Sequence, residues 1–221
     1  WFWGTLVLYV ILKGAGLVFP LFVEEELGVS AIFSFLAGLW MIVLILRFQR
    51  KAPMYSVNML LGLTQGRRQI SWIWPVLSGL AVALAAGFLL VNYFYQAVTP
   101  FSEMMDWAEP SWVFVVFLMI AVLTAPFLEE AIFRGFFFRV LEDSRGRSFA
   151  FWIVGASFGL LHMDQYWGNW AGIGIVVLLG FLLTWFRMVS GSARPAMILH
   201  YTFNMMMVVV PVFFFVLSRP V

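Results

Sequence analysis

Seven apolar stretches constrain the fold of this chain more than any other feature. A membrane-spanning helix needs about 20 predominantly apolar residues. Stretches of about this kind lie at residues 5–23, 30–48, 70–91, 111–131, 149–163, 170–188 and 195–217. Because backbone polar groups in lipid must be paired within the spanning segment, such stretches fold as helices. The sequence therefore predicts an all-α fold, a polytopic transmembrane helix bundle.

The composition also indicates a membrane protein. Of the 221 residues, 63% are hydrophobic and 11% are charged, whereas soluble domains carry about 25% charged residues. The chain contains no cysteine, which excludes disulfides, thiolate nucleophiles and cysteine-ligated metals. No soluble domain or repeat is visible. We expect residues 1–221 to form a single integral membrane domain with seven spans, or eight if another span precedes Trp1, surrounded by membrane lipids.

Basic residues fall on alternate connections between the predicted spans. Eleven of the 13 follow the second, fourth and sixth stretches: Arg47, Arg50, Lys51, Arg67, Arg68, Arg134, Arg139, Arg145, Arg147, Arg187 and Arg194. Because cytoplasmic loops are enriched in lysine and arginine, we expect this face and the N-terminus to be cytoplasmic. The charges follow membrane topology, so no nucleic-acid partner is expected. The compact chain leads us to expect a prokaryotic inner membrane.

Several polar side chains lie inside the predicted spans, where such residues are costly and usually functional. Glu129 and Glu130 are adjacent in the fourth span, and Arg134 follows Glu130 by four residues. That spacing places Glu130 and Arg134 on one helix face, where they can form an ion pair. Glu129 is rotated by about 100° and points elsewhere. The only two histidines, His162 and His200, lie in the fifth and seventh spans.

Helical spacing gives each histidine a neighbour on its own face. Phe158 precedes His162 by four residues, and Asn204 follows His200 by four. At a rise of 1.5 Å per residue, the acids and histidines lie at overlapping depths. They could therefore line one cavity that opens toward the cytoplasm. Taken singly, intramembrane histidine and asparagine often serve as interhelical hydrogen-bond partners, and the acid–arginine pair could be structural. Their convergence favours chemistry.

The same residues form three ordered motifs that resemble the EExxxR, FxxxH and HxxxN signatures of the CAAX protease and bacteriocin-processing family. This family includes the Ras-converting CAAX endopeptidase. The motifs are Glu129-Glu130-Ala-Ile-Phe-Arg134, Phe158-Gly-Leu-Leu-His162 and His200-Tyr-Thr-Phe-Asn204, within a core at residues 111–208. The resemblance implies an intramembrane endopeptidase that acts on a protein or peptide substrate, and we expect it to need no cofactor.

The resemblance also implies a role for each motif residue. Glu129 would be the general base, and His162 would hold or activate the attacking water. The ion pair of Glu130 with Arg134 would support the base. His200 and Asn204 would stabilise the oxyanion of the tetrahedral intermediate.

Two alternatives stay open at the level of the sequence. His162, His200 and Glu129 could bind zinc, with the second glutamate as the base, although the HExxH spacing is absent and neither histidine has a carboxylate near it in sequence. The chain could also be a non-catalytic immunity or partner-binding protein, or a proton-coupled transporter that uses the same residues. It lacks the paired halves of many transporters. The sequence specifies no oligomeric state.

The sequence also predicts two local features of the bundle. Pro126, three residues before the first glutamate, is expected to kink the fourth span and to free a backbone carbonyl near the acids. Gly14, Gly16, Gly172 and Gly174 are expected to mark close helix contacts.

Overall fold

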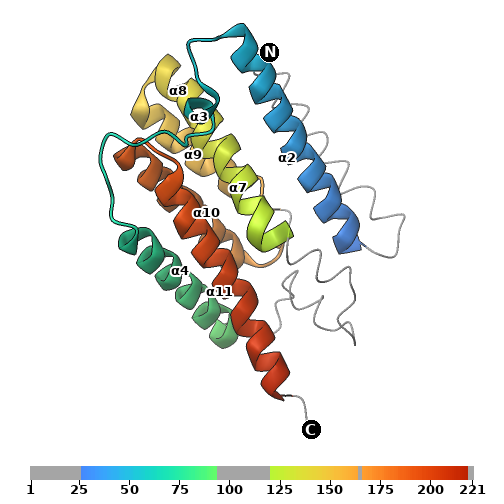
Figure 1. Ribbon diagram of the computed structural model, residues 1–221. Coiled ribbons are helices and arrows are strands. Elements are labelled where there is room, and N and C mark those ends of the chain that lie inside the picture. The colour runs from blue at the N-terminus through green and yellow to red at the C-terminus, as the bar shows by residue number, and fades with distance from the viewer. Residues whose placement is uncertain (1–25, 94–119, 164–165, 219–221) are drawn as a thin grey trace.

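The computed structural model describes residues 26–93, 120–163 and 166–218 (Figure 1). These residues form helices and connecting turns, and no strand occurs among them. The helices are α2 (Glu26–Lys51), α3 (Val57–Leu60), α4 (Ile73–Tyr93), α7 (Ala125–Glu130), α8 (Phe138–Arg145), α9 (Arg147–Leu160), α10 (Trp170–Ser190) and α11 (Arg194–Ser218), with π-helical segments η2 (Ile120–Thr124) and η3 (Ala131–Phe137). The predicted all-α fold is confirmed for this part of the chain.

The described helices coincide with the predicted apolar stretches. Stretches two, three, five, six and seven correspond to α2, α4, α9, α10 and α11. The first stretch, residues 5–23, and residues 111–119 of the fourth lie outside the described residues. By length and composition alone, one described helix, Trp170–Ser190, can cross a membrane, and Ile73–Leu89 is a shorter apolar helix. The polytopic bundle stays a prediction.

Local sequence signals set the ends of α9 and α10. Gly146, between α8 and α9, has φ 85°, and Gly191, after α10, has φ 80°. Glycine adopts this left-handed region without the steric penalty of a Cβ atom. At its start, α10 is capped by Asn169, whose side-chain oxygen accepts the backbone N–H of Gly172 at 2.9 Å. Helix α9 is 14 residues long and α10 is 21 residues long.

Close helix packing occurs at glycines other than those predicted. A Cβ atom on Gly180 of α10 would lie 2.8 Å from the Gly155 carbonyl oxygen of α9, so these two helices meet backbone to backbone. A Cβ on Gly172 would instead meet the Tyr166 ring in the preceding turn, at 2.7 Å, and one on Gly174 would meet no atom of the described residues within 4 Å. The prediction for Gly174 is therefore wrong, because this residue faces open space. Gly14 and Gly16 lie outside the described residues.

The fourth predicted stretch is one helix whose winding changes repeatedly. It runs through η2, α7, η3 and α8, and so alternates between π and α winding from Ile120 to Arg145. Pro126 is buried at the start of α7, directly after the first π segment. A proline supplies no backbone N–H to the preceding turn, which is a common cause of helix irregularity. The acids follow at the end of α7, between the two π segments.

Two clusters of apolar side chains hold this helix in place. The larger cluster lies between α4, η3, α9, α10 and α11, with Phe158, Leu183 and Leu199 almost fully buried. The smaller one joins α2, α3 and η3 through Ile45, Leu60 and Phe136. The motif-bearing helix is therefore packed from several directions, which fixes where its acids point.

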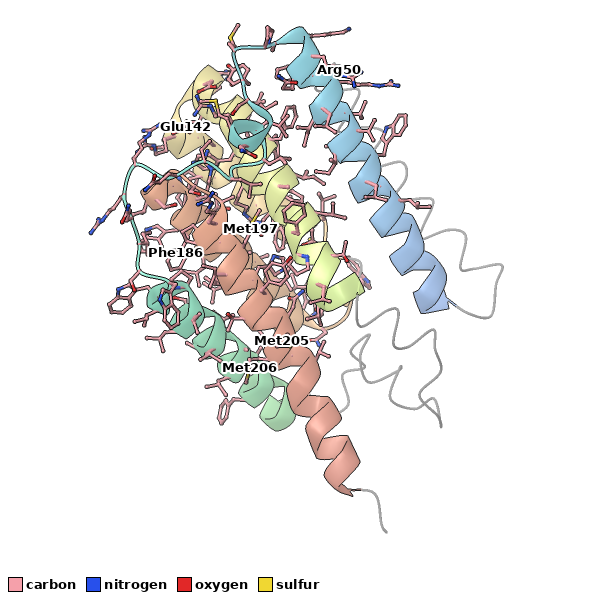
Figure 2. All side chains as sticks on the ribbon, in the orientation of Figure 1. Arg50, Glu142, Phe186, Met197, Met205 and Met206 are labelled. Carbon is pink, nitrogen blue, oxygen red and sulfur yellow. The ribbon has the colours of Figure 1, made fainter. Side chains whose placement is uncertain are left out.

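The basic connections gather at one end of the molecule (Figure 1). Figure 2 shows Arg50 of α2 and Glu142 of α8 at this end. Contacts between connections confirm the grouping: Arg67 donates to the Glu142 carboxylate at 3.3 Å, and the Ala193 backbone N–H donates to the Gly62 carbonyl at 2.8 Å. This agrees with the predicted grouping of charge.

Two of the eleven basic residues are not part of this surface. Arg134 is 0% exposed and Arg187 is 3% exposed. Both guanidinium groups hydrogen-bond inside the protein, so their charges do not contribute to this surface.

Glycine substitutions in α4 test the packing of α4 against α11. A Cβ atom at Gly79 would lie 2.7 Å from the Leu199 carbonyl oxygen, whereas one at Gly87 would have no neighbour within 4 Å in the part of the chain that the structure describes. We expect Gly79→Ala to lower the unfolding temperature in detergent micelles. Gly87→Ala, the matched control on the same helix, should leave it unchanged or raise it, because alanine favours a helix by about 1 kcal/mol over glycine. Equal effects of both substitutions would contradict this packing.

Candidate active site

Glu130 and Arg134 form a fully buried ion pair at the centre of the candidate site. Nη1 of Arg134 donates to Oε1 of Glu130 at 2.9 Å, and both side chains are 0% exposed. The two residues are four positions apart across the boundary between α7 and η3. The ion pair predicted from spacing is confirmed. Removing two charges from water costs several kcal/mol per ion, so such a pair needs further hydrogen bonds to persist.

Helix α10 supplies those further hydrogen bonds to Arg134. Nη2 donates to the Gly180 carbonyl at 2.8 Å, and Nε donates to the Thr184 hydroxyl at 3.3 Å. The guanidinium carbon also lies 4.4 Å from the centre of the Phe158 ring, within the range of a cation–π interaction. Arg134 thereby joins the helix of the acids to both α9 and α10.

His200 of α11 is hydrogen-bonded to the same glutamate oxygen. Its Nδ1 lies 3.0 Å from Oε1 of Glu130, and the residue is 4% exposed. A carboxylate paired with arginine can only accept, so Nδ1 of His200 carries the proton. In the neutral ring, Nε2 is then an acceptor, and it lies 3.8 Å from Oε2 of Glu129. The other oxygen of Glu130, Oε2, is buried with no hydrogen-bond partner among the described residues.

His162 lies near Glu129 on the α9 side of the site. It lies in the turn that follows α9, because that helix ends at Leu160 rather than at residue 163. Its Nδ1 lies 2.7 Å from the Phe158 carbonyl oxygen, which only accepts, so Nδ1 is again the protonated nitrogen. The imidazole stacks on the Phe158 ring with centroids 4.4 Å apart, as the spacing predicted. Its Nε2 lies 3.8 Å from Oε2 of Glu129.

Glu129 is therefore the point at which both histidines converge. Its side chain is 24% exposed, in contrast to the buried Glu130. Direct hydrogen bonds to nitrogen measure about 2.7–3.2 Å, so the two 3.8 Å separations suit a bridging water better than direct bonds. Neutral rings would present two Nε2 lone pairs beside a carboxylate oxygen. Such a set of acceptors can hold and polarise the two protons of one water molecule.

Asn204 completes the residues that the sequence singled out. It lies on α11, one helical turn after His200, and is partly buried. The structure thus brings Glu129, Glu130, Arg134, His162 and His200 together and places Asn204 on the same helix as His200.

Two further residues at the site were not predicted. Thr184 links Arg134 to the Gly180 carbonyl, to which its own hydroxyl donates at 2.7 Å. A polar residue in the apolar stretch 170–188 was the available signal. Tyr166 lies in the connection after His162, four positions along the chain. Burial raises the pKa of Tyr166, and the charge of Glu129 raises it further, so the phenol stays protonated as a hydrogen-bond donor.

Glu129, His162 and His200 are the residues of the alternative zinc site. Within the described residues, no group of three or more histidine, cysteine, aspartate or glutamate side chains has an arrangement that could hold a metal ion. Nε2 of His162 and Nε2 of His200 each lie 3.8 Å from Oε2 of Glu129. The lone pairs of these atoms can also accept hydrogen bonds from a water molecule.

Comparison with known proteins links this geometry to a family. Residues 110–206 match the family model for type II CAAX prenyl endopeptidase Rce1-like proteins. The matched segment contains all three motifs and so confirms the resemblance drawn from them. The comparisons with curated proteins and with solved structures found no match.

Unfolding measurements test whether the buried pair is satisfied as described. Arg134→Met would leave the Glu130 carboxylate buried without its arginine partner, so we expect the free energy of unfolding to fall by about 3–5 kcal/mol. The double substitution Glu130→Leu with Arg134→Met removes both charges and should recover much of that loss. A double variant at least as unstable as Arg134→Met alone would contradict the assignment.

Proposed function

Because residues 110–206 form an Rce1-like domain, and this is a family of membrane-integral endopeptidases, we propose that the protein is an intramembrane endopeptidase. In this proposal, a water activated by Glu129 hydrolyses a peptide bond of a membrane-associated protein or peptide. The observation that carries the proposal is the convergence of Nε2 of His162 and Nε2 of His200 on Oε2 of Glu129, each at 3.8 Å.

The proposed reaction begins with a water between these three atoms. Glu129 takes one proton from the water as the oxygen attacks the scissile carbonyl carbon. The carbonyl becomes an oxyanion in a tetrahedral intermediate. When the carbon–nitrogen bond breaks, Glu129 returns the proton to the leaving amide nitrogen, so that an amine and a carboxylic acid are released. The base ends in its starting state.

The hydrogen bonds of the two rings give them different roles. His162 donates through Nδ1 to the Phe158 carbonyl, which orients Nε2 as an acceptor for the water. His200 donates through Nδ1 to Glu130, so its Nε2 can donate to an oxyanion only when the ring carries both protons. Asn204, one turn along α11, would supply a neutral amide donor. Preorganised donors of this kind contribute about 3–4 kcal/mol each in favourable cases.

The substrate would reach Glu129 from the basic end of the molecule or from within the bilayer. The excess of arginine and lysine at that end supports its assignment to the cytoplasmic side, and the full set of apolar stretches supports a polytopic membrane protein. The matched family is named for a prenyl endopeptidase, so a prenylated C-terminal peptide is the first substrate to test.

Variants of the base and of the water-holding histidine test the proposed chemistry. We expect Glu129→Gln and His162→Ala to lower the cleavage rate by at least about 10²-fold, because general base catalysis contributes about 10²–10⁴-fold. The assay uses purified protein in proteoliposomes with a farnesylated CAAX peptide and its unprenylated counterpart, and new termini are found by mass spectrometry.

Asp143→Asn is the matched control for these variants. It neutralises a carboxylate that is 38% exposed and paired with Arg139 outside the site, and it should keep wild-type activity. Wild-type rates in Glu129→Gln and His162→Ala would contradict the proposed mechanism and favour a non-catalytic role for the same residues.

Removal of metal separates the proposed mechanism from the zinc alternative. Nε2 of each histidine lies 3.8 Å from Oε2 of Glu129, and the zinc alternative would use these same atoms. We expect a zinc chelator to leave cleavage unchanged after dialysis, as measured by the same peptide assay. Loss of activity that is restored by added zinc would show instead that these side chains bind the metal.

A further inference from the structure

The helix of the two glutamates has an unusual winding on both sides of them. The π segments Ile120–Thr124 and Ala131–Phe137 flank α7, which ends at Glu130. A π turn bonds residue i to i+5 and so takes in one residue more than an α turn. Loss of one such extra residue would rotate everything beyond it by about 100°. The directions of Glu129 and Glu130 therefore depend on this winding.

The second π segment leaves one carbonyl to a donor from another helix. The backbone N–H of Phe138 reaches the carbonyls of Gly135 and Phe133 and bypasses that of Arg134, its partner in an α-helix. Nε of Arg187, on α10, donates to this Arg134 carbonyl at 2.7 Å. Arg187 is 3% exposed, so a nearly fully buried guanidinium donates to a backbone oxygen of the helix that carries the two glutamates.

A carbonyl of the first π segment also accepts a hydrogen bond from a side chain of another helix, α11. The Tyr201 hydroxyl donates to the carbonyl of Leu123 at 2.7 Å. Leu123 belongs to the π segment Ile120–Thr124 and lies next to Val122, whose carbonyl is the one that an N–H at Pro126 would reach in an α-helix. Tyr201 directly follows His200 in sequence. Each π segment thus presents one carbonyl to a side-chain donor of a different neighbouring helix.

A simpler role for Arg187 would be to neutralise Glu142. Nη2 of Arg187 lies 3.8 Å from this carboxylate. Arg147 and Arg67 are closer to the carboxylate, at 3.0 and 3.3 Å, and both contact its other oxygen, Oε1. Glu142 therefore has nearer partners, and the shortest polar contact of Arg187 is with the π-segment carbonyl.

We propose that Arg187 and Tyr201 are positioning residues that hold the π winding of residues 120–137 and thereby the directions of Glu129 and Glu130. An unpaired carbonyl is costly in a lipid environment, so each donor stabilises the winding that exposes its carbonyl. Without the donor, the segment gains by returning to α winding, in which the N–H four residues on takes that carbonyl. The kinetic consequences of this proposal rest on the proposed peptidase function.

Kinetics in the proteoliposome assay give the first test. We expect Tyr201→Phe and Arg187→Gln to lower kcat about tenfold or more with KM little changed, because small displacements of a catalytic group affect the rate rather than binding. Arg187→Lys keeps a donor and should retain more of kcat than Arg187→Gln. The matched controls are Tyr55→Phe and Arg67→Gln, which remove contacts to Asp143 and Glu142 at the exposed end and should keep wild-type kcat.

A spectroscopic measurement tests the same proposal without catalysis. The chain has two histidines, so protein with nitrogen-labelled imidazoles gives two sets of ring signals, and the set that remains in His162→Ala belongs to His200. Because Nδ1 of His200 bonds to Glu130, we expect this signal to shift in Tyr201→Phe and Arg187→Gln. Thr202→Val serves as the control for changes beside His200, since its hydroxyl bonds within α11.

The two readouts fail for different reasons. If Tyr201→Phe and Arg187→Gln leave the His200 signal where the controls leave it, the positioning role is wrong. If the wild-type protein cleaves no peptide, the proposed function is wrong, and the shift of the His200 signal still decides whether these donors position the glutamate.

Discussion

The buried ion pair between Glu130 and Arg134 is the interaction on which the rest of the structure depends. Two charges without water need partners from the protein itself. Arg134 obtains them from the Gly180 carbonyl and Thr184 of α10, and Glu130 obtains one from His200 of α11. Three helices therefore meet at two side chains. The close approach of α9 and α10 at Gly180 and Gly155 occurs at the residue whose carbonyl accepts from the guanidinium.

This arrangement makes two adjacent glutamates chemically different. Glu130 is enclosed, and its Oε1 is bound by an arginine and a histidine. Glu129, one residue earlier, is 24% exposed and faces the Nε2 atoms of both histidines. A buried support beside a partly accessible base suits a hydrolytic site, since the base must keep its geometry while water and substrate exchange.

Spacing along single helices predicted a large part of the site. The i,i+4 rule paired Glu130 with Arg134 and Phe158 with His162, and both contacts exist. The rule describes neighbours on one helix, so it could not reveal the partners that Arg134 finds on α10. For the same reason, spacing could not show that tertiary contacts bury Arg187 together with Arg134. The π segments were equally hidden, because a proline signals irregularity without specifying its form.

The account makes one central claim, that Glu129 activates a water which attacks the peptide bond directly. Single-turnover cleavage in heavy-oxygen water tests it most directly, with the product and the protein both weighed by mass spectrometry. The account predicts that the heavy oxygen appears in the new carboxyl group of the product, while the protein keeps its original mass at every time point. A covalent peptide–protein adduct, or heavy oxygen in the side chain of Glu129, would contradict it.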